Sequence, residues 1–121
     1  MSVVQATQAN FESLITGNDI VILDFWAPWC GPCRTFGPIF ETVAEQFPEA
    51  VFAKVNTEEE QMIAAHFGIR SIPTLMAFRE QILVFNQAGA LPASALTELV
   101  RQVQALDMDA VRREIEAAEK N

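Results

Sequence analysis

The chain has 121 residues, the size of one domain, and half of them are apolar while a fifth are charged. This composition excludes a disordered chain, and two cysteines are too few for a disulfide-stapled miniprotein. The net charge of −8 repels nucleic-acid phosphates and anionic lipid surfaces, so neither is an expected partner. No apolar run is long enough to cross a bilayer, and the first residues lack the pattern of a secretion signal, so we expect a cytoplasmic protein.

The first thirty residues predict a short strand, a short helix and a buried strand. Val3 and Val4 indicate the short strand, and the helix follows a possible cap at Thr7 or Asn10. Its apolar residues recur at helical spacing: Phe11, Leu14 and Ile15. The run Ile20–Ala27 is nearly continuously apolar and rich in β-branched and aromatic residues, which is typical of a parallel strand covered on both faces.

A long helix is predicted to begin just after residue 30. Its apolar side chains recur every three or four residues and form one core-facing stripe of Phe36, Ile39, Phe40, Val43, Ala44 and Phe47. Pro38 lies inside this pattern and removes one backbone hydrogen bond, so we expect a kink there. Val51–Asn56 then predicts another strand.

Residues 57–68 predict a capped helix. Thr57 and Glu60 have the spacing of a capping box, and Gly68 is expected to end the helix in a left-handed conformation. Three side chains of this helix are expected to point inward: Met62, Ile63 and Phe67.

The remaining residues predict a hairpin and two helices. Two short strands, Thr74–Phe78 and Ile82–Asn86, are joined by three residues, so they must be antiparallel; the turn lacks the usual Asn-Gly pair. Pro92 starts a helix with one apolar face of Leu96, Leu99, Val100, Val103 and Leu106. Residues 109–119 form a further possible helix, so we divide the chain into a domain over 1–106 and a C-terminal extension over 107–121. Together these elements predict an α/β domain with a mixed sheet.

The strongest chemical signal is Cys30-Gly31-Pro32-Cys33, between the buried strand and the long helix. A thiol at the start of a helix meets free backbone N–H groups and the positive end of the helix dipole, and both favour the thiolate. Pro32 suits a first helical turn because its missing N–H is not needed there. Cys33, one turn further in, should keep the higher pKa. We therefore expect Cys30 to attack a disulfide and Cys33 to resolve the mixed disulfide.

A Cys-x-x-Cys pair can also belong to a zinc site or form a purely structural disulfide. Zinc needs four ligands, and the chain offers one histidine, His66, far from the cysteines in sequence. A structural disulfide is not expected in a reducing compartment. We therefore predict no metal site and interpret His66 as a surface residue.

Three segments of the chain resemble the signatures of the thioredoxin family. The first is Trp26-Ala27-Pro28-Trp29-Cys30-Gly31-Pro32-Cys33-Arg34, followed by Pro38. The second is Ile69-Arg70-Ser71-Ile72-Pro73-Thr74, and the third is Gly89-Ala90-Leu91. Their order and spacing also agree, so the resemblance covers about residues 2–106.

The resemblance implies the thioredoxin fold, a central mixed five-stranded sheet flanked by helices on both faces. It also implies a cis peptide bond before Pro73, with the backbone of Ile72 pairing with the substrate chain; from the residues alone, a trans proline at a strand start is the better expectation. The surface expected to bind substrate proteins consists of Trp29, Gly31, Pro32, Ile72, Pro73, Gly89 and Ala90. Trp29 on an exposed loop is its apolar centre.

Asp24 is a carboxylate among the apolar residues of the predicted buried strand. If it is buried, its pKa should rise; an exposed aspartate at a strand end is an equally good interpretation of the spacing. The resemblance implies that Asp24 lies beneath Cys33 and helps to deprotonate it, with Lys54 of the adjacent strand nearby. From the residues alone, Lys54 is a surface lysine.

These features predict a thioredoxin-type protein disulfide reductase that acts through Cys30 and Cys33 without a bound cofactor. The resemblance implies that its partners are disulfide-containing proteins and an NADPH-dependent thioredoxin reductase, and we expect a monomer. Two alternatives stay open: an oxidising or isomerising thiol enzyme, and a thioredoxin-fold binding subunit that recruits a partner through its C-terminal extension.

Overall fold

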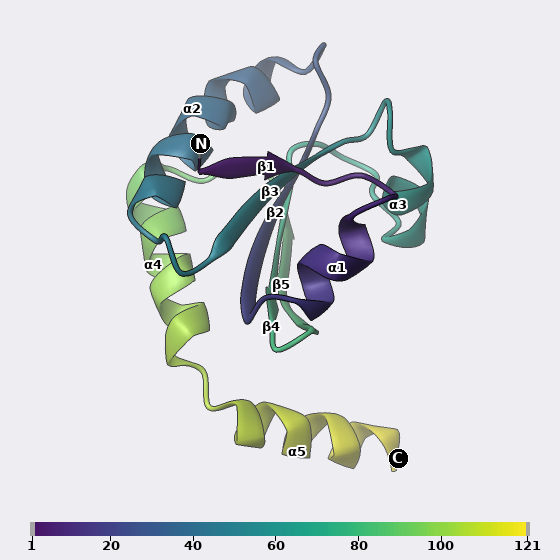
Figure 1. Cartoon of the computed structure of the whole chain (residues 1–121), viewed down its shortest axis with the longest axis vertical. Helices are drawn as coiled ribbons and strands as arrows, with labels where there is room; N and C mark the ends of the chain where they lie inside the picture. Colours follow the sequence, from purple (N-terminus) through teal and green to yellow (C-terminus); the bar gives the residue numbers. More distant parts are fainter. Residues whose placement is uncertain (1, 121) are drawn as a thin grey trace.

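The computed structural model describes residues 2–120 and shows a mixed sheet covered by helices on both faces (Figure 1). The strands are β1 (Val3–Gln5), β2 (Ile20–Trp26), β3 (Val51–Asn56), β4 (Thr74–Arg79) and β5 (Ile82–Ala88). The helices are α1 (Phe11–Thr16), α2 (Gly31–Glu45), α3 (Gln61–His66), α4 (Ala93–Ala105) and α5 (Met108–Glu119). The five strands have the order β1-β3-β2-β4-β5, with β1, β3 and β2 parallel and β4 and β5 each antiparallel to its neighbour. This arrangement confirms the predicted fold.

Strand β2 lies at the centre of the sheet, and its residues from Ile20 to Phe25 are all buried. Alternate side chains point to opposite faces of the sheet. Ile20 and Ile22 pack in the core formed with α2 and α4, whereas Val21 and Leu23 pack in the core formed with α1 and α3. Figure 1 shows these two helix pairs on opposite sides of the strands. The alternation therefore directs Asp24 toward the α2 side.

The apolar stripe predicted for α2 is the inner face of the helix. Phe36 and Phe40 are fully buried, and the ring of Phe40 lies 5.2 Å from that of Phe52 on β3. Burying each such side chain contributes on the order of 2–3 kcal/mol, so this face holds α2 firmly on the sheet. Pro38 lies inside the helix with its ring exposed, on the side away from this core.

The capping box predicted at Thr57 and Glu60 is wrong. The Thr57 hydroxyl donates to the Trp26 carbonyl at 3.0 Å, and the Glu60 carboxylate accepts from the Gln8 amide at 2.9 Å. Both side chains are engaged with other segments, so α3 begins only at Gln61, without a side-chain cap. The end of the helix is as predicted, because Gly68 adopts a φ of +62°.

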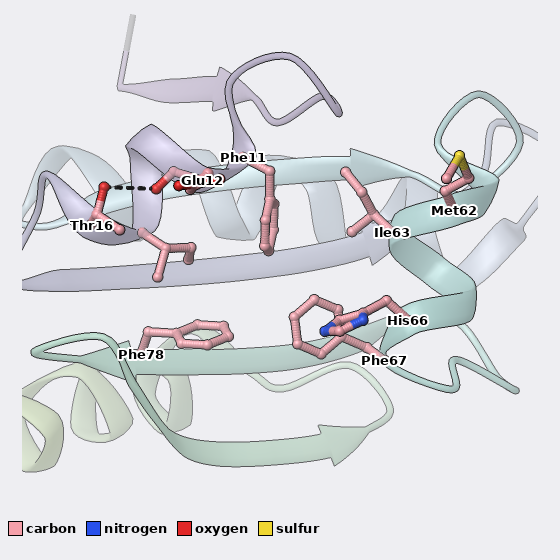
Figure 2. Close-up of a pocket in the computed structure, with 9 residues that line it drawn as sticks. Phe11, Glu12, Thr16, Met62, Ile63, His66, Phe67 and Phe78 are labelled. Carbon is pink, nitrogen blue, oxygen red and sulfur yellow. Dashed lines mark hydrogen bonds between the residues drawn. The ribbon is translucent and has the colours of Figure 1, made fainter.

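The inward orientation predicted for Met62 is also wrong, since 68% of its surface is exposed. Helix α3 is short, and Ile63 and Phe67, which are one turn apart, are the side chains that pack into the core. Met62 is rotated away from them and stands beside an apolar hollow of about 360 Å³ between α1 and α3 (Figure 2). Phe11 and Phe78 also line this hollow.

The β4–β5 hairpin is tighter than the sequence predicts. Arg79 pairs with Ile82, so the loop contains two residues, Glu80 and Gln81, with φ values of +51° and +71°. Residues other than glycine, asparagine and aspartate rarely adopt this backbone conformation, which costs on the order of 1 kcal/mol per residue. The loop is tied down because the Glu80 amide donates to the Asp19 carbonyl at 2.8 Å.

The helix predicted over 109–119 is present as α5, which begins one residue earlier. Asp107 caps it by accepting a hydrogen bond from the Ala110 amide at 3.1 Å. Met108 is buried, and the Arg112 guanidinium pairs with Glu80 of the hairpin. Helix α5 is therefore attached to the domain near this turn. Over residues 2–120, no helix is long and apolar enough to cross a bilayer.

Deleting residues 107–121 should lower the free energy of unfolding by about 1–2 kcal/mol. The deletion exposes the surface that Met108 covers, whose burial is worth about 1.5–3 kcal/mol, and the loss is partly offset because α5 no longer has to be ordered. Urea denaturation measures the change. Full-length Ile115→Ala, which truncates a partly exposed side chain of the same helix, is the control. Unchanged stability after the deletion would show that α5 does not contribute to folding.

Candidate active site

The two cysteines lie where β2 ends and α2 begins. Cys30 is the N-cap of α2, with Gly31 and Pro32 in the first turn, as predicted. Its sulfur accepts a hydrogen bond from the Cys33 amide at 3.2 Å. The structure holds the pair as a disulfide with a Cα–Cα distance of 5.2 Å. The Cys30 sulfur thus accepts a hydrogen bond from a backbone N–H group that has no partner within the helix, at the positive end of the helix dipole.

Both cysteines are largely buried. Cys30 is 5% exposed and Cys33 is 2% exposed. Ala27 forms a buried cluster with the two cysteines, and Trp26 and Ile72 pack against this cluster. What distinguishes the cysteines is their position on the helix, since Cys30 lies outside the first turn and Cys33 lies within it.

Strand register places the three signature segments at one edge of the sheet. Phe25 at the end of β2 pairs with Thr74 at the start of β4, and Thr74 pairs with Ala88 at the end of β5. The Ile72 carbonyl oxygen accordingly lies 3.8 Å from the Cys30 sulfur. This distance is a contact rather than a hydrogen bond, because a disulfide sulfur carries no proton.

Pro73 and Gly89 join the second and third segments. The peptide bond before Pro73 is cis, as the resemblance implies, and Pro73 is buried. The Gly89 amide donates to the Pro73 carbonyl at 2.8 Å, and Ala90 is exposed beside it. No atom lies within 4 Å of where a Gly89 side chain would begin; the φ of +106° is what requires glycine.

Trp29 is the most exposed of the predicted site residues, with 66% of its surface accessible. Gly31 and Pro32 are exposed next to it. The Trp29 indole N–H donates to the carboxylate of Glu58, which follows β3. A large apolar side chain is therefore open to solvent beside the disulfide.

Asp24 is completely buried, which settles the two interpretations of the sequence in favour of burial. It pairs in register with Lys54 of β3. The Lys54 ammonium group lies 4.2 Å from the centre of the Trp26 ring, and 3.7 Å from where a side chain at Gly37 of α2 would begin. Asp24, Lys54 and Trp26 are therefore on the α2 side of the sheet, under the helix that carries Cys33.

Burial raises the pKa of Asp24 to about 7, and the positive charge of Lys54 opposes part of this rise. Among the described residues, neither carboxylate oxygen of Asp24 has a hydrogen-bond partner, and neither does the buried indole nitrogen of Trp26. No hydrogen bond therefore stabilises the ionised form. Near neutral pH this carboxyl group can accept and release a proton.

Sequence reasoning missed two residues that contact the exposed loop. Glu58 has no role predicted from the sequence, but its carboxylate accepts a hydrogen bond from the Trp29 indole. Arg34 was noted only within the motif, but its guanidinium donates to the Pro28 carbonyl at 3.0 Å. The Glu58 contact has no sequence signal, because it depends on how two distant segments pack. Arg34 and Pro28 are near in sequence, and the conformation of the loop between them brings them together. His66 lines the hollow in Figure 2 and contacts Phe67 edge to face. Over residues 2–120, no three potential ligand side chains form a cluster for a metal ion.

Comparisons with known proteins agree with this geometry. The family model described as Thioredoxin matches residues 2–102. A Streptomyces coelicolor relative, provisionally named thioredoxin 2, is 53% identical over 114 residues, which cover 94% of this chain and 85% of the relative. The thioredoxin of Porphyra purpurea is 47% identical over 98 residues, 79% of this chain and 92% of that protein. A mutant thioredoxin of Halobacterium salinarum superposes with a TM-score of 0.80 at 34% identity, covering 86% of this chain and 92% of that one.

The chain belongs to the thioredoxin family. With its Cys-x-x-Cys pair at the start of α2, it is a thioredoxin-type dithiol–disulfide oxidoreductase with protein-disulfide reductase activity.

Asp24 should make the stability of the protein fall as the pH rises from about 4 to about 7. Its pKa is 3.8 as a free side chain and about 7 in the fold, so the folded chain binds this proton more tightly than the unfolded chain. The contribution of Asp24 to the free energy of unfolding is most favourable below pH 4, where the group is protonated in both states. It is lost by about pH 7, where burying the ionised group lowers the free energy of unfolding by about 2–4 kcal/mol. Asp24→Asn should therefore stabilise the disulfide form by that amount at pH 8 and hardly at all at pH 4.

Denaturant unfolding of both chains at pH 4 and pH 8 measures this difference. Glu98→Gln, an exposed carboxylate on α4, is the control and should change stability little at either pH. A destabilised Asp24→Asn chain at pH 8 would instead identify Asp24 as a carboxylate that the fold requires.

Proposed function

We propose that Cys30 is the attacking thiolate and Cys33 the resolving thiol of this protein disulfide reductase. The observation that carries the assignment is the N-cap position of Cys30, whose sulfur accepts the Cys33 amide N–H. In the reduced protein the same contact and the helix dipole stabilise a negative charge on Cys30. Cys33 is enclosed in the first turn and lacks this advantage.

The reaction then proceeds in two exchanges. The Cys30 thiolate attacks one sulfur of a substrate disulfide, which breaks that disulfide, releases one substrate thiolate and leaves a mixed disulfide. The Cys33 thiolate next attacks the Cys30 sulfur, forms the Cys30–Cys33 disulfide and releases the second substrate thiolate. Two electrons and, after protonation, two protons reach the substrate. The dithiol itself is the redox group, and no bound cofactor enters these steps.

Asp24 is the proposed proton acceptor for Cys33. It is buried on the α2 side, and its pKa of about 7 allows proton exchange near neutral pH. Lys54 is the proposed positioning residue of this pair, since its positive charge favours the ionised carboxylate. Its ammonium group is held between Trp26 and α2.

The proposed substrate surface surrounds the Cys30 sulfur at the edge of the sheet. Trp29 offers an exposed aromatic face, and the Ile72 backbone lies within contact distance of the sulfur. The remaining members of the surface are Gly31, Pro32, Pro73, Gly89 and Ala90. An extended substrate chain can approach here because Gly31 and Gly89 have open space where a side chain would begin.

The proposed physiological setting follows from the direction of electron flow. Gly31-Pro32 between the cysteines is typical of the reducing members of the family, so we propose that an NADPH-dependent thioredoxin reductase restores the dithiol. We further propose a monomer in the cytoplasm that takes part in electron transport and redox homeostasis. Insulin reduction coupled to NADPH and a thioredoxin reductase tests the activity and the electron donor together.

We propose that residues 1–106 form the catalytic domain and residues 107–121 an extension. Every proposed site residue lies before residue 106, and the family model ends at residue 102. The deletion described above should accordingly reduce insulin at a rate within about twofold of the full chain. A tenfold loss of rate in a folded deletion variant would place part of the active site in α5.

Cys33→Ser should trap substrate proteins as lasting mixed disulfides on Cys30, while Cys30→Ser should trap almost none. The serine at 33 cannot make the second attack, whereas the first attack depends on the Cys30 thiolate alone. Non-reducing gels of cell extract incubated with each variant should show high-mass bands for Cys33→Ser that disappear with dithiothreitol. Equal trapping by both variants would contradict the division of roles.

Asp24→Asn should slow the second exchange roughly tenfold to a hundredfold and leave the first nearly unchanged. The carboxyl group that accepts the Cys33 proton is lost, while the N-cap contact of Cys30 is retained. Stopped-flow measurements of mixed-disulfide decay between pH 6 and pH 8 separate the steps. The wild-type rate should rise as Asp24 ionises near pH 7, and the variant should lack this rise. An equal slowing of both steps would remove Asp24 from the role of proton acceptor.

A further inference from the structure

The exposed loop between β2 and α2 is held from outside by two charged side chains. The loop presents Trp29, whose ring is mostly accessible to solvent. A large side chain on an exposed loop ordinarily samples several rotamers, and ordering it on binding costs about 0.5–1.5 kcal/mol. The contacts of Arg34 and Glu58 restrict the loop before any substrate arrives.

Glu58 is itself fixed before it binds the Trp29 indole. Its amide donates to the Asn56 side-chain oxygen at 2.9 Å, and its carbonyl accepts from the Gln61 side chain at 3.2 Å. The preceding residue, Thr57, donates to the Trp26 carbonyl through both its amide, at 2.8 Å, and its hydroxyl. The turn after β3 is therefore bonded to the end of β2, and it presents the Glu58 carboxylate at a defined place.

Arg34 holds the other part of the loop. It lies one turn after Cys30 in α2, where its amide donates to the Cys30 carbonyl at 3.1 Å. Its guanidinium reaches back to the Pro28 carbonyl at 3.0 Å. Arg34 belongs to none of the ion pairs found over residues 2–120, so this backbone contact is the polar interaction that the structure records for its side chain.

We infer that Arg34 and Glu58 are positioning residues that preorganise the Pro28–Trp29 loop as a rigid platform for substrate proteins. The inference rests on the proposed function. A preorganised platform lowers the entropic cost of docking a protein next to the Cys30 sulfur. It does not alter the sulfur chemistry, which depends on the helix start and on Asp24. The two residues therefore act on KM for protein disulfides rather than on kcat.

Glu58 and Arg34 could instead influence substrate binding through their charges alone. That explanation makes a different prediction, which suitable variants can test. Glu58→Gln removes the negative charge but keeps a side-chain oxygen that accepts the indole N–H, whereas Glu58→Ala removes both. Glu59→Ala removes an equal charge from the same turn, and Arg101→Ala removes an exposed arginine of α4. These two variants control for net charge.

The test measures KM and kcat for insulin at saturating reductant with the full-length variants. Glu58→Ala and Arg34→Ala should each raise KM about three- to tenfold with kcat within about twofold of wild type. Glu58→Gln, Glu59→Ala and Arg101→Ala should stay within about twofold in both constants. The Trp29 indole N–H, followed by NMR, should exchange with water faster in Glu58→Ala than in Glu58→Gln.

Each other outcome overturns a distinct claim. A wild-type chain that cannot reduce insulin would overturn the proposed function. An active wild type with unchanged KM in Glu58→Ala and Arg34→Ala would overturn the positioning inference alone. An equal KM increase in Glu58→Gln and Glu58→Ala, or an increase in the two control variants, would assign the effect to charge and reject the hydrogen-bonded platform.

Discussion

The hydrogen bond from the Cys33 amide to the Cys30 sulfur is the interaction on which the proposed chemistry of this protein depends. It exists because the buried strand β2 ends at the point where α2 begins, so that the residue between them caps the helix. A helix N-terminus offers unsatisfied N–H groups to whatever side chain caps it. The capping atom is usually a side-chain oxygen, but in this chain it is the Cys30 sulfur. In the proposed reaction this backbone contact favours the thiolate form of Cys30.

The same centre carries a cost that the fold tolerates. Asp24 stands in the middle of the central strand, where every neighbour in sequence is apolar, and desolvation holds its pKa near 7. A carboxylate there weakens the fold whenever it is ionised. The large apolar faces that α2 and α4 bury on the sheet offset that cost. Retaining a destabilising group in the core is expected at a functional site, and it supports the proposed role of Asp24.

Around this centre, the less regular segments form the proposed substrate surface. Four chain segments meet at one edge of the sheet because the ends of β2, β3 and β5 and the start of β4 are in register. Each contributes through backbone or through one exposed side chain, so the surface is formed mainly by the fold and little by charge. Helix α5 lies at the other end of the strands, away from this surface and next to the hairpin turn (Figure 1). It contacts Glu80 of the turn through Arg112.

The sequence by itself determined the fold class, the cysteine pair and the helix that carries it, because these follow from local patterns: an apolar run of strand length, a 3.6-residue stripe and a thiol at a helix start. It did not decide whether Asp24 is buried or exposed. It also predicted a capping box at Thr57 that is absent, and an inward orientation of Met62 that is wrong. Those features depend on which segments become neighbours. Thr57 bonds to the Trp26 carbonyl, and Ile63 and Phe67 take the core side of α3, only once β2, β3 and α3 have packed. The contact of Glu58 with Trp29 likewise joins parts of the chain whose relation no local pattern encodes. Burial and hydrogen-bond partners across strands were therefore decided by tertiary structure, since they are properties of pairs of distant residues rather than of the sequence around each one.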